Sequence, residues 1–282
     1  MALLNSLTKP LRTLIGSTLN IHLGTEQNDF LIGGNGDDLL FGFGGDDLIL
    51  GGMGNDSYYA GSGNDLLIDG LGDDLMDGGE GIDTYISQTG IGSPAVIDLT
   101  SGIASSRDTG ISTLVSIENI TAGEGNDTLI GNEGSNRLLG SSGADNIQGG
   151  NGPDTYVYTS SSDSKSSAMD VITGFDFGAG ADQFEFQIDV VNNTGRTTFT
   201  AGTTLTLDQA LSVTLRPSRL DGGGLEIDQA QLVTITDGSI AGDYLVVDGN
   251  DIAGYQAGED AVIKLVGALN KEGFGLGDFA VV

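Results

Sequence analysis

The 282-residue sequence has no cysteine, no tryptophan and one histidine, His22. Without cysteine, the chain has no disulfide, no thiolate metal site and no thiol redox chemistry. One histidine is too few for an HExxH zinc site, and no GxSxG nucleophile motif occurs. Paired acids of the kind that glycosidases use are abundant, but a tryptophan for sugar stacking is missing. We therefore expect no catalytic residue, and we expect His22 to be a strand or cap residue.

Basic residues and long apolar runs are also scarce. The chain has 10 Lys and Arg against 40 Asp and Glu, for a net charge of −30, and residues 24–86 contain no Lys or Arg. Such a chain repels nucleic acid and anionic membranes, so neither is an expected partner. No stretch approaches the roughly 18 apolar residues of a membrane helix, and Pro10 interrupts the only apolar stretch near the start. We expect a soluble protein.

A nine-residue repeat dominates what is present. It runs from Gly24 to Ile86 in seven units, and a second block from Ala122 to Val157 adds four. The sixth position is acidic or amide throughout, at Asp29, Asp38, Asp47, Asp56, Asp65, Asp74, Asp83, Asp127, Asn136, Asp145 and Asp154. The eighth position of the first block is always apolar, at Leu31, Leu40, Ile49, Tyr58, Leu67, Met76 and Tyr85. Self-similarity at this period is typical of stacked coils.

The repeat predicts a solenoid in which two units make one coil. Glycines permit the positive φ of tight turns, and the apolar residues that follow suit short strands. Strands on one side then recur every 18 residues, and the eighth-position side chains stack inward. The sixth-position aspartates stack as well, with expected pairs Asp29–Asp47, Asp38–Asp56, Asp47–Asp65, Asp56–Asp74 and Asp65–Asp83.

Stacked carboxylates repel each other unless a cation lies between them. Two carboxylates and several turn carbonyls supply about six oxygens, which suits calcium. Because the unfolded chain has no formed site, ion binding then contributes to folding. The candidate calcium ligands are the sixth-position residues above, Asp182, and the turn glycines Gly34, Gly36, Gly45, Gly52, Gly54, Gly63, Gly72 and Gly81.

These blocks resemble the repeats-in-toxin (RTX, haemolysin-type) family, whose consensus is GGxGxDxUx with U apolar. The resemblance implies several bound calcium ions, an extracellular protein and export by type I secretion from an uncleaved C-terminal signal. The chain ends in GDFAVV, an acid followed by apolar residues, which is similar to such a signal. Two departures weaken individual sites. Gln27 replaces a glycine in the first unit, and Asn136 replaces an aspartate beside Asp154.

The segments outside the repeats are β-like too. Residues 87–121 contain the alternating runs 95–100 and 114–120, and we interpret them as irregular coils that extend one solenoid; a separate second roll is the alternative. Residues 122–186 form the second block and a capping coil in which Asp170, Asp176 and Asp182 frame apolar residues. Residues 187–282 suggest a small antiparallel sheet or sandwich. The acids of this region are either exposed turn residues or ligands of a further ion, and they are Asp243, Asp248, Asp251 and Asp260.

One apolar pattern goes beyond the consensus. Alternate units of the first block carry apolar residues on both sides of the inward eighth position, at Phe30, Ile32, Leu48, Leu50, Leu66, Ile68 and Ile86. These side chains are expected to face outward on one sheet, where so large an apolar patch is unusual. The sequence leaves two occupants open. One is the chain itself, through its C-terminal sheet or the N-terminal segment of residues 1–23 with Leu3, Leu4, Leu7 and Leu11. The other is a neighbouring copy, in a dimer, lattice or filament.

The sequence therefore predicts an all-β secreted protein with a calcium-bound parallel β-roll over residues 24–86 and a β-rich C-terminal region. We expect calcium to drive its folding outside the cell, and we expect a structural role at a surface, with self-association as one form of that role. The alternative is a carbohydrate-binding or targeting module of a secreted toxin or polysaccharide-active enzyme.

Overall fold

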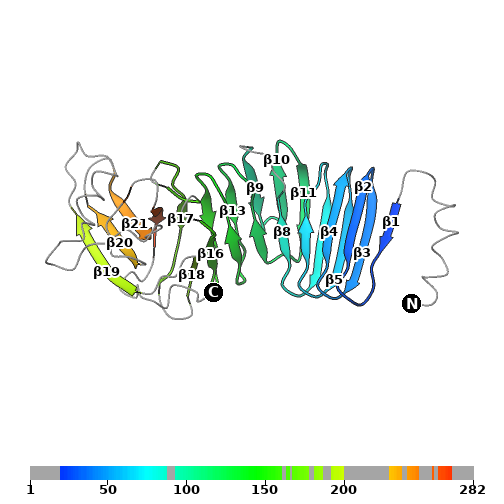
Figure 1. Cartoon of the computed structure of the whole chain (residues 1–282), viewed down its shortest axis with the longest axis horizontal. Coiled ribbons are helices and arrows are strands. Elements are labelled where there is room, and N and C mark those ends of the chain that lie inside the picture. The colour runs from blue at the N-terminus through cyan, green and yellow to red at the C-terminus, as the bar shows by residue number, and fades with distance from the viewer. Residues whose placement is uncertain are drawn as a thin grey trace. The chain divides into compact units, whose positions relative to one another are not determined.

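A computed structural model describes residues 20–87, 93–160, 163–165, 167–177, 181–186, 192–199, 229–236, 240–247, 256 and 260–268. All regular elements in these ranges are strands, and most pair in parallel (Figure 1). The predicted all-β fold with a parallel roll is thus confirmed. The chain divides into two compact units, residues 1–123 and 124–282.

The first unit is a roll of two sheets that the chain visits in turn. Sheet one contains, in spatial order, β1 (Asn20–Leu23), β3 (Asp38–Gly44), β5 (Ser57–Ser62), β7 (Leu75–Glu80), β11 (Gly110–Val115), β10 (Ile103–Ser106) and β9 (Ala95–Asp98). Sheet two contains β2 (Phe30–Asn35), β4 (Leu48–Met53), β6 (Leu66–Ile68), β8 (Thr84–Ile86) and β12 (Asn119–Thr121). Repeat strands pair in parallel with the expected 18-residue offset, as in Leu39 with Ser57.

The core of this roll is the stack of eighth-position side chains. Leu40, Tyr58 and Met76 point inward from sheet one, and Ile49 and Leu67 point inward from sheet two, all fully buried. His22 occupies the equivalent inward position of β1, because it pairs with Leu40. The strand register of the repeat therefore extends back to Asn20–Leu23, and His22 is a strand residue, as expected.

Residues 93–121 interrupt the nine-residue repeat with three strands of their own and a return to the roll. Strands β9, β10 and β11 make an antiparallel meander. Strand β11 then pairs in parallel with β7, and β12 pairs in parallel with β8. The chain thus leaves the repeat for the meander and returns to both sheets in register.

The second unit repeats the two-sheet arrangement. Strands β13 (Thr128–Ile130), β15 (Asn146–Gln148) and β17 (Val171–Thr173) pair in parallel in one sheet, as do β14 (Arg137–Leu139), β16 (Thr155–Tyr158) and β18 (Gln183–Phe186) in the other. Aromatic rings close the interior, and the centroids of Phe175 and Phe184 lie 4.5 Å apart. The coil after the second repeat block therefore contains a cluster of packed aromatic side chains.

The C-terminal strands extend the β17 sheet. Strand β22 (Ala261–Val266) pairs in parallel with β17, and β21 (Gly242–Val247) and β20 (Gln229–Ile235) follow antiparallel. The antiparallel arrangement is thus found here, whereas β19 (Asn192–Phe199) pairs with β20 in parallel. The GDFAVV ending lies outside the described residues, as do residues 1–19.

Candidate metal centre

The two-sheet coil places the sixth-position aspartates of the first unit in two rows. In each expected pair, the backbone N–H of one aspartate donates to Oδ1 of the aspartate 18 residues later, at 2.7–2.8 Å. The second unit does the same from Asp127 to Asp145 and from Asn136 to Asp154, at 2.8 and 2.9 Å. One carboxylate oxygen of each acceptor therefore ties neighbouring coils together.

The other carboxylate oxygen is buried and has no hydrogen-bond partner among the described residues. This holds for the Oδ2 atoms of Asp38, Asp47, Asp56, Asp65, Asp83, Asp145, Asp154 and Asp170. An ionised oxygen without a partner is costly to bury, so such a row calls for a cation. Oxygen is also the ligand atom that calcium prefers, so the residues present fit that ion.

Glycines make the room around these oxygens. A Cβ on Gly33, at the first position of its repeat, would lie 2.6 Å from Oδ2 of Asp38, so no side chain fits there. Glycines at the second and fourth positions have φ from 91° to 139°, at Gly34, Gly36, Gly45, Gly52, Gly54, Gly61, Gly63, Gly72, Gly79 and Gly81. A Cβ on Gly54 would meet the backbone of Gly36 in the neighbouring coil. The stacked turns thus bring backbone carbonyls close to the carboxylate row.

Burial makes these carboxyl groups hold protons more tightly. It raises the pKa of Asp47 and Asp83 to about 6, and that of Asp74 to about 7. In the second unit, burial raises the pKa of Asp145 and Asp154 to about 7, and that of Asp170 to about 8. Nearby carboxylates add to the effect, so the carboxyl groups of the metal-free rows lose their protons at higher pH than an ordinary aspartate does.

Two acids that the 18-residue spacing did not assign also belong to the rows. Oε2 of Glu118 accepts the N–H of Asp83 at 2.8 Å, 35 residues away, and Oδ1 of Asp170 accepts the N–H of Asp145 at 2.9 Å, 25 residues away. Long insertions hide both residues from an 18-residue rule. The signal that identifies them is the buried apolar residue two positions later, Ile120 and Ile172.

Oδ2 of Asp74 accepts the N–H of Gly70 at 3.4 Å. Three other candidate ligands also have their second side-chain oxygen occupied by a protein donor. Oδ2 of Asp29 accepts the N–H and hydroxyl of Thr25, at 2.6 and 2.8 Å. The side-chain oxygen of Asn136 accepts the N–H of Asn132 at 2.8 Å, and Oδ2 of Asp182 accepts the N–H of Asp176 at 2.9 Å. Protein donors thus take the place that a cation would take in these turns.

One row of the first unit ends in a different way. Ser112 stands in register after Asp74, and its hydroxyl donates at 3.0 Å to Asp69, an aspartate at the first position of its repeat. The hydroxyl of Tyr85 donates to the other Asp69 oxygen at 2.7 Å. Burial raises the pKa of Asp69. Two hydroxyl donors therefore hold this buried carboxyl group.

The remaining candidates do not form a cluster of side chains. Nε2 of His22 lies 3.5 Å from Oδ1 of Asp38. Asp243 accepts from Thr234 at 2.7 Å and Asp260 accepts from the Gln256 N–H at 2.8 Å, whereas residues 248 and 251 lie outside the described residues. In the described part of the chain, no three His, Cys, Asp or Glu side chains gather at one point. A cation in the rows must therefore take backbone carbonyls as well as carboxylates.

No helix within the described ranges has the length and apolar character to cross a membrane. Two family models match the chain. The model "RTX calcium-binding nonapeptide repeat (4 copies)" matches residues 23–58 and 50–85, and the model "Peptidase M10 serralysin C terminal" matches residues 101–211.

No curated protein matches the sequence. Among solved structures, the chain is similar to the extracellular lipase LipA from Serratia marcescens, with 16% identity and a TM-score of 0.28. The match covers 95% of this chain but only 40% of the lipase chain.

The repeat match settles the nature of the ligand. RTX nonapeptide repeats bind several calcium ions, and proteins with these repeats and serralysin C-terminal domains are exported by type I secretion to the cell exterior. Both matched regions are non-catalytic parts of such proteins. The chain is therefore a secreted, calcium-binding protein that carries RTX repeats over residues 23–85.

Proposed function

We propose that calcium ions lie along the carboxylate rows and that each is held by stacked aspartates and by turn carbonyls of the predicted glycines. The observation that carries this proposal is the series of buried Oδ2 atoms without a hydrogen-bond partner among the described residues. The ligand carboxylates are those of Asp38, Asp47, Asp56, Asp65, Asp74, Asp83, Asp127, Asp145, Asp154 and Asp170. The turns of Asp29, Asn136 and Asp182 bind calcium more weakly, because protein donors already occupy their oxygens.

Calcium acts on this chain as a folding trigger. At a net charge of −30, the roll brings like charges together at the spacing of neighbouring strands. Ions that bind only the folded chain stabilise it by about 1.4 kcal/mol per site at ten times the dissociation constant. The chain is exported unfolded and folds in the calcium-rich exterior.

The folded protein has a structural role at a surface and no catalytic activity of its own. This rests on the family models, which match calcium-binding and C-terminal regions. The match to the C-terminal part of a peptidase family favours a second candidate, an accessory module that targets a secreted enzyme, for example to carbohydrate. A glycan array with the calcium-saturated protein separates the two. Specific glycan binding supports the module, and its absence together with assembly into larger particles supports the structural role.

The Asn136 position offers a test of the site assignment by gain of function. Asn136→Asp restores the carboxylate of the repeat beside Asp154 and is expected to add one calcium ion. It should raise the free energy of unfolding in saturating calcium by about 1 kcal/mol. This is the contribution of one additional site when calcium is present at a few times its dissociation constant. Native mass spectrometry counts the ions, and thermal unfolding measures the stability.

Asn126→Asp is the matched control, because the exposed side chain of Asn126 lies in the same block and accepts the Ala144 N–H outside the rows. It makes the same change in charge and is expected to add no ion. Equal ion counts for the two variants would contradict the assignment of Asn136 to a calcium site.

A further inference from the structure

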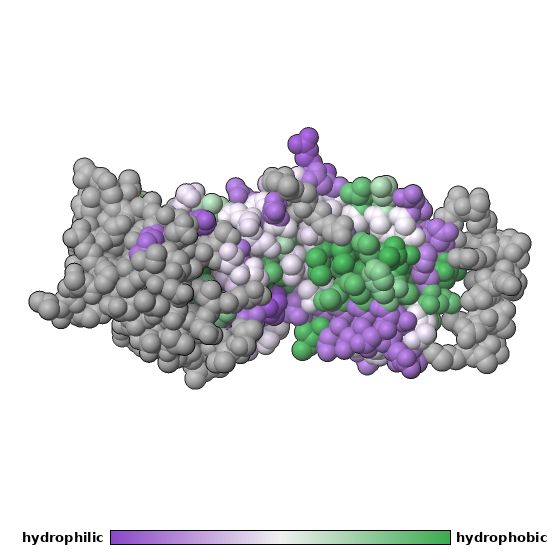
Figure 2. Space-filling view, in the orientation of Figure 1, coloured by the Kyte–Doolittle hydropathy of each residue, from purple (hydrophilic) through white to green (hydrophobic). Residues whose placement is uncertain are grey.

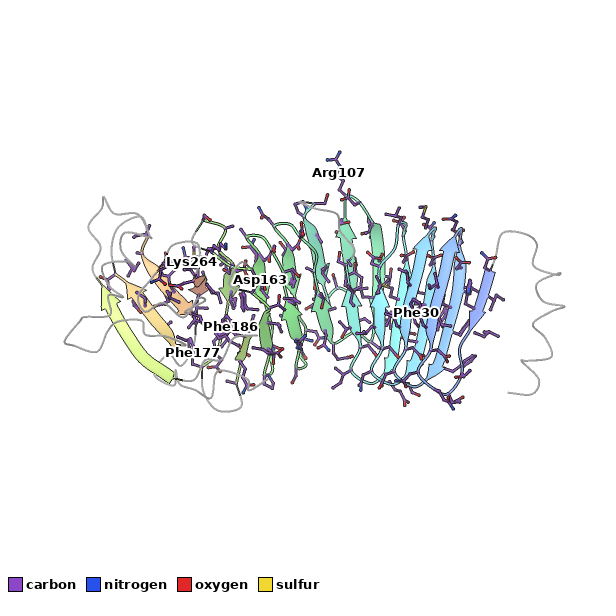
Figure 3. All side chains as sticks on the ribbon, in the orientation of Figure 1. Phe30, Arg107, Asp163, Phe177, Phe186 and Lys264 are labelled. Atoms are coloured by element: carbon purple, nitrogen blue, oxygen red, sulfur yellow. The ribbon has the colours of Figure 1, made fainter. Side chains whose placement is uncertain are left out.

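The outer face of sheet two in the first unit carries a continuous apolar surface. Its members are the seven outward residues that the sequence singles out, Phe30, Ile32, Leu48, Leu50, Leu66, Ile68 and Ile86, which we call the outer apolar face. Phe30, Ile32 and Leu66 are 62%, 47% and 41% exposed. Figure 2 shows the hydrophobic area with a hydrophilic band beside it, and Figure 3 places Phe30 on it.

The area of this face argues against a second copy as its occupant. Four strands about 4.8 Å apart and three residues along each strand give a face on the order of 150 Å² in plan. A stable interface buries about 800 Å² on each partner. Two copies would also bring together two chains with a net charge of −30 each. A small, apolar and basic occupant fits better.

Residues 1–19 have that chemistry. They include Leu3, Leu4, Leu7 and Leu11, their charged side chains are Lys9 and Arg12, and they contain no acid. Residues 24–86, by contrast, contain acids and no base. The segment and the roll are thus complementary in charge as well as in apolar character.

The segment is joined covalently to the end of the roll that carries β1 and β2. Residues 1–19 lead directly into β1, which pairs with β3 in sheet one. Strand β1 is the end strand of sheet one, at the same end of the roll as β2. There β2, which carries Phe30 and Ile32, is the last strand of its sheet in the first unit. A segment of 19 residues spans about 28 Å even as a helix, which exceeds the width of four strands.

We propose that residues 1–19 dock on the outer apolar face of their own chain and shield it from solvent. The segment is an intramolecular cover of the calcium-folded roll, and this face is not an assembly surface.

A tryptophan probe tests this proposal, because the chain has no tryptophan of its own. Leu7→Trp and Leu11→Trp are made separately and measured in saturating calcium. At least one of them is expected to show blue-shifted emission and slowed acrylamide quenching, at a monomer mass and independently of protein concentration. Adding Ile68→Asp, at the centre of the face, is expected to abolish the shift. Adding Leu75→Asp, a half-buried outward residue on β7 of sheet one, is expected to leave it intact.

Several results would overturn the proposal. One is solvent-exposed emission from both probes in calcium, and another is a shift that survives Ile68→Asp. A shift that appears only as the mass doubles in sedimentation velocity would make a second copy the occupant. Circular dichroism in the same samples shows whether each variant still folds on calcium addition, which separates a failure to dock from a failure to fold. Leu66→Asp, at a more exposed position, replaces Ile68→Asp if the latter disturbs folding.

Discussion

Replacing Asp65 by alanine is expected to raise sharply the calcium concentration at which the roll folds. Asp65 is fully buried between Asp47 and Asp83 in its row. Its Oδ1 accepts the Asp47 N–H at 2.7 Å, and its Oδ2 is buried without a hydrogen-bond partner among the described residues, which is why we propose it as a calcium ligand. Alanine removes both the hydrogen-bond acceptor and the proposed calcium ligand. It therefore affects the proposed ion between Asp47 and Asp65 and the one between Asp65 and Asp83.

The expected loss of stability is the sum of the lost hydrogen-bond acceptor and the lost calcium ions. A buried N–H left without an acceptor costs about 1–3 kcal/mol. Two ions lost at ten times their dissociation constant cost about 1.4 kcal/mol each. Asp65→Ala should therefore destabilise the calcium-loaded roll by about 4–6 kcal/mol. Asp65→Asn keeps an oxygen for the Asp47 N–H, so about half of the loss should remain.

The measurement is a calcium titration followed by circular dichroism, with bound ions counted at saturation. Glu80→Ala is the control, since Glu80 is an exposed acid of the same repeat block. It should leave both the midpoint and the ion count unchanged. If Asp65→Ala and Glu80→Ala behave alike, the rows are not the calcium sites.

In the presence of chelator, the roll is expected to gain structure as the pH falls from about 7.5 to about 5. The buried carboxyl groups have folded-state pKa values of about 6 for Asp47 and Asp83, and about 7 for Asp74, Asp145 and Asp154, against 3.8 for an ordinary aspartate. The folded chain thus binds more protons than the unfolded chain between these values. By linkage, this stabilisation is complete below the unfolded pKa and is lost as the pH rises through about 6–7.

Protons thus substitute for calcium in the rows. We expect the structure that added calcium induces to shrink toward pH 5, because the acidified chain is already folded, and calcium binding there should release protons. Circular dichroism in chelator at several pH values, all above the isoelectric point of about 4.1, provides the measurement. Loss of structure on acidification in chelator would show that these carboxyl groups are not buried in the metal-free fold.

The repeat made much of this molecule predictable. A strict period of nine assigns the inward residue of each strand, such as Leu40 and Tyr58, and pairs aspartates 18 residues apart. Both features depend only on local turn chemistry and on stacking of identical coils. Where the coils are identical, a step of 18 residues along the sequence always moves one coil along the roll.

Three of the positions that spacing did not assign follow a break in the period. Glu118 and Asp170 enter the rows after longer coils, and Ser112 ends a row after the meander. Insertions of variable length have no fixed effect on register, so only pairing in space identifies these residues. Asp69 was missed for another reason. It stands where the repeat normally has glycine, and its role depends on the hydroxyl groups of Tyr85 and Ser112, which come from distant parts of the chain.

The most direct test of calcium-driven folding is sedimentation velocity at neutral pH, first in chelator and then in millimolar calcium, with ions counted in the same samples. We predict an expanded chain in chelator and a compact particle in calcium, with the change in frictional ratio following the uptake of several ions. A chain that is already compact in chelator, or that binds ions without any change in frictional ratio, would contradict the account.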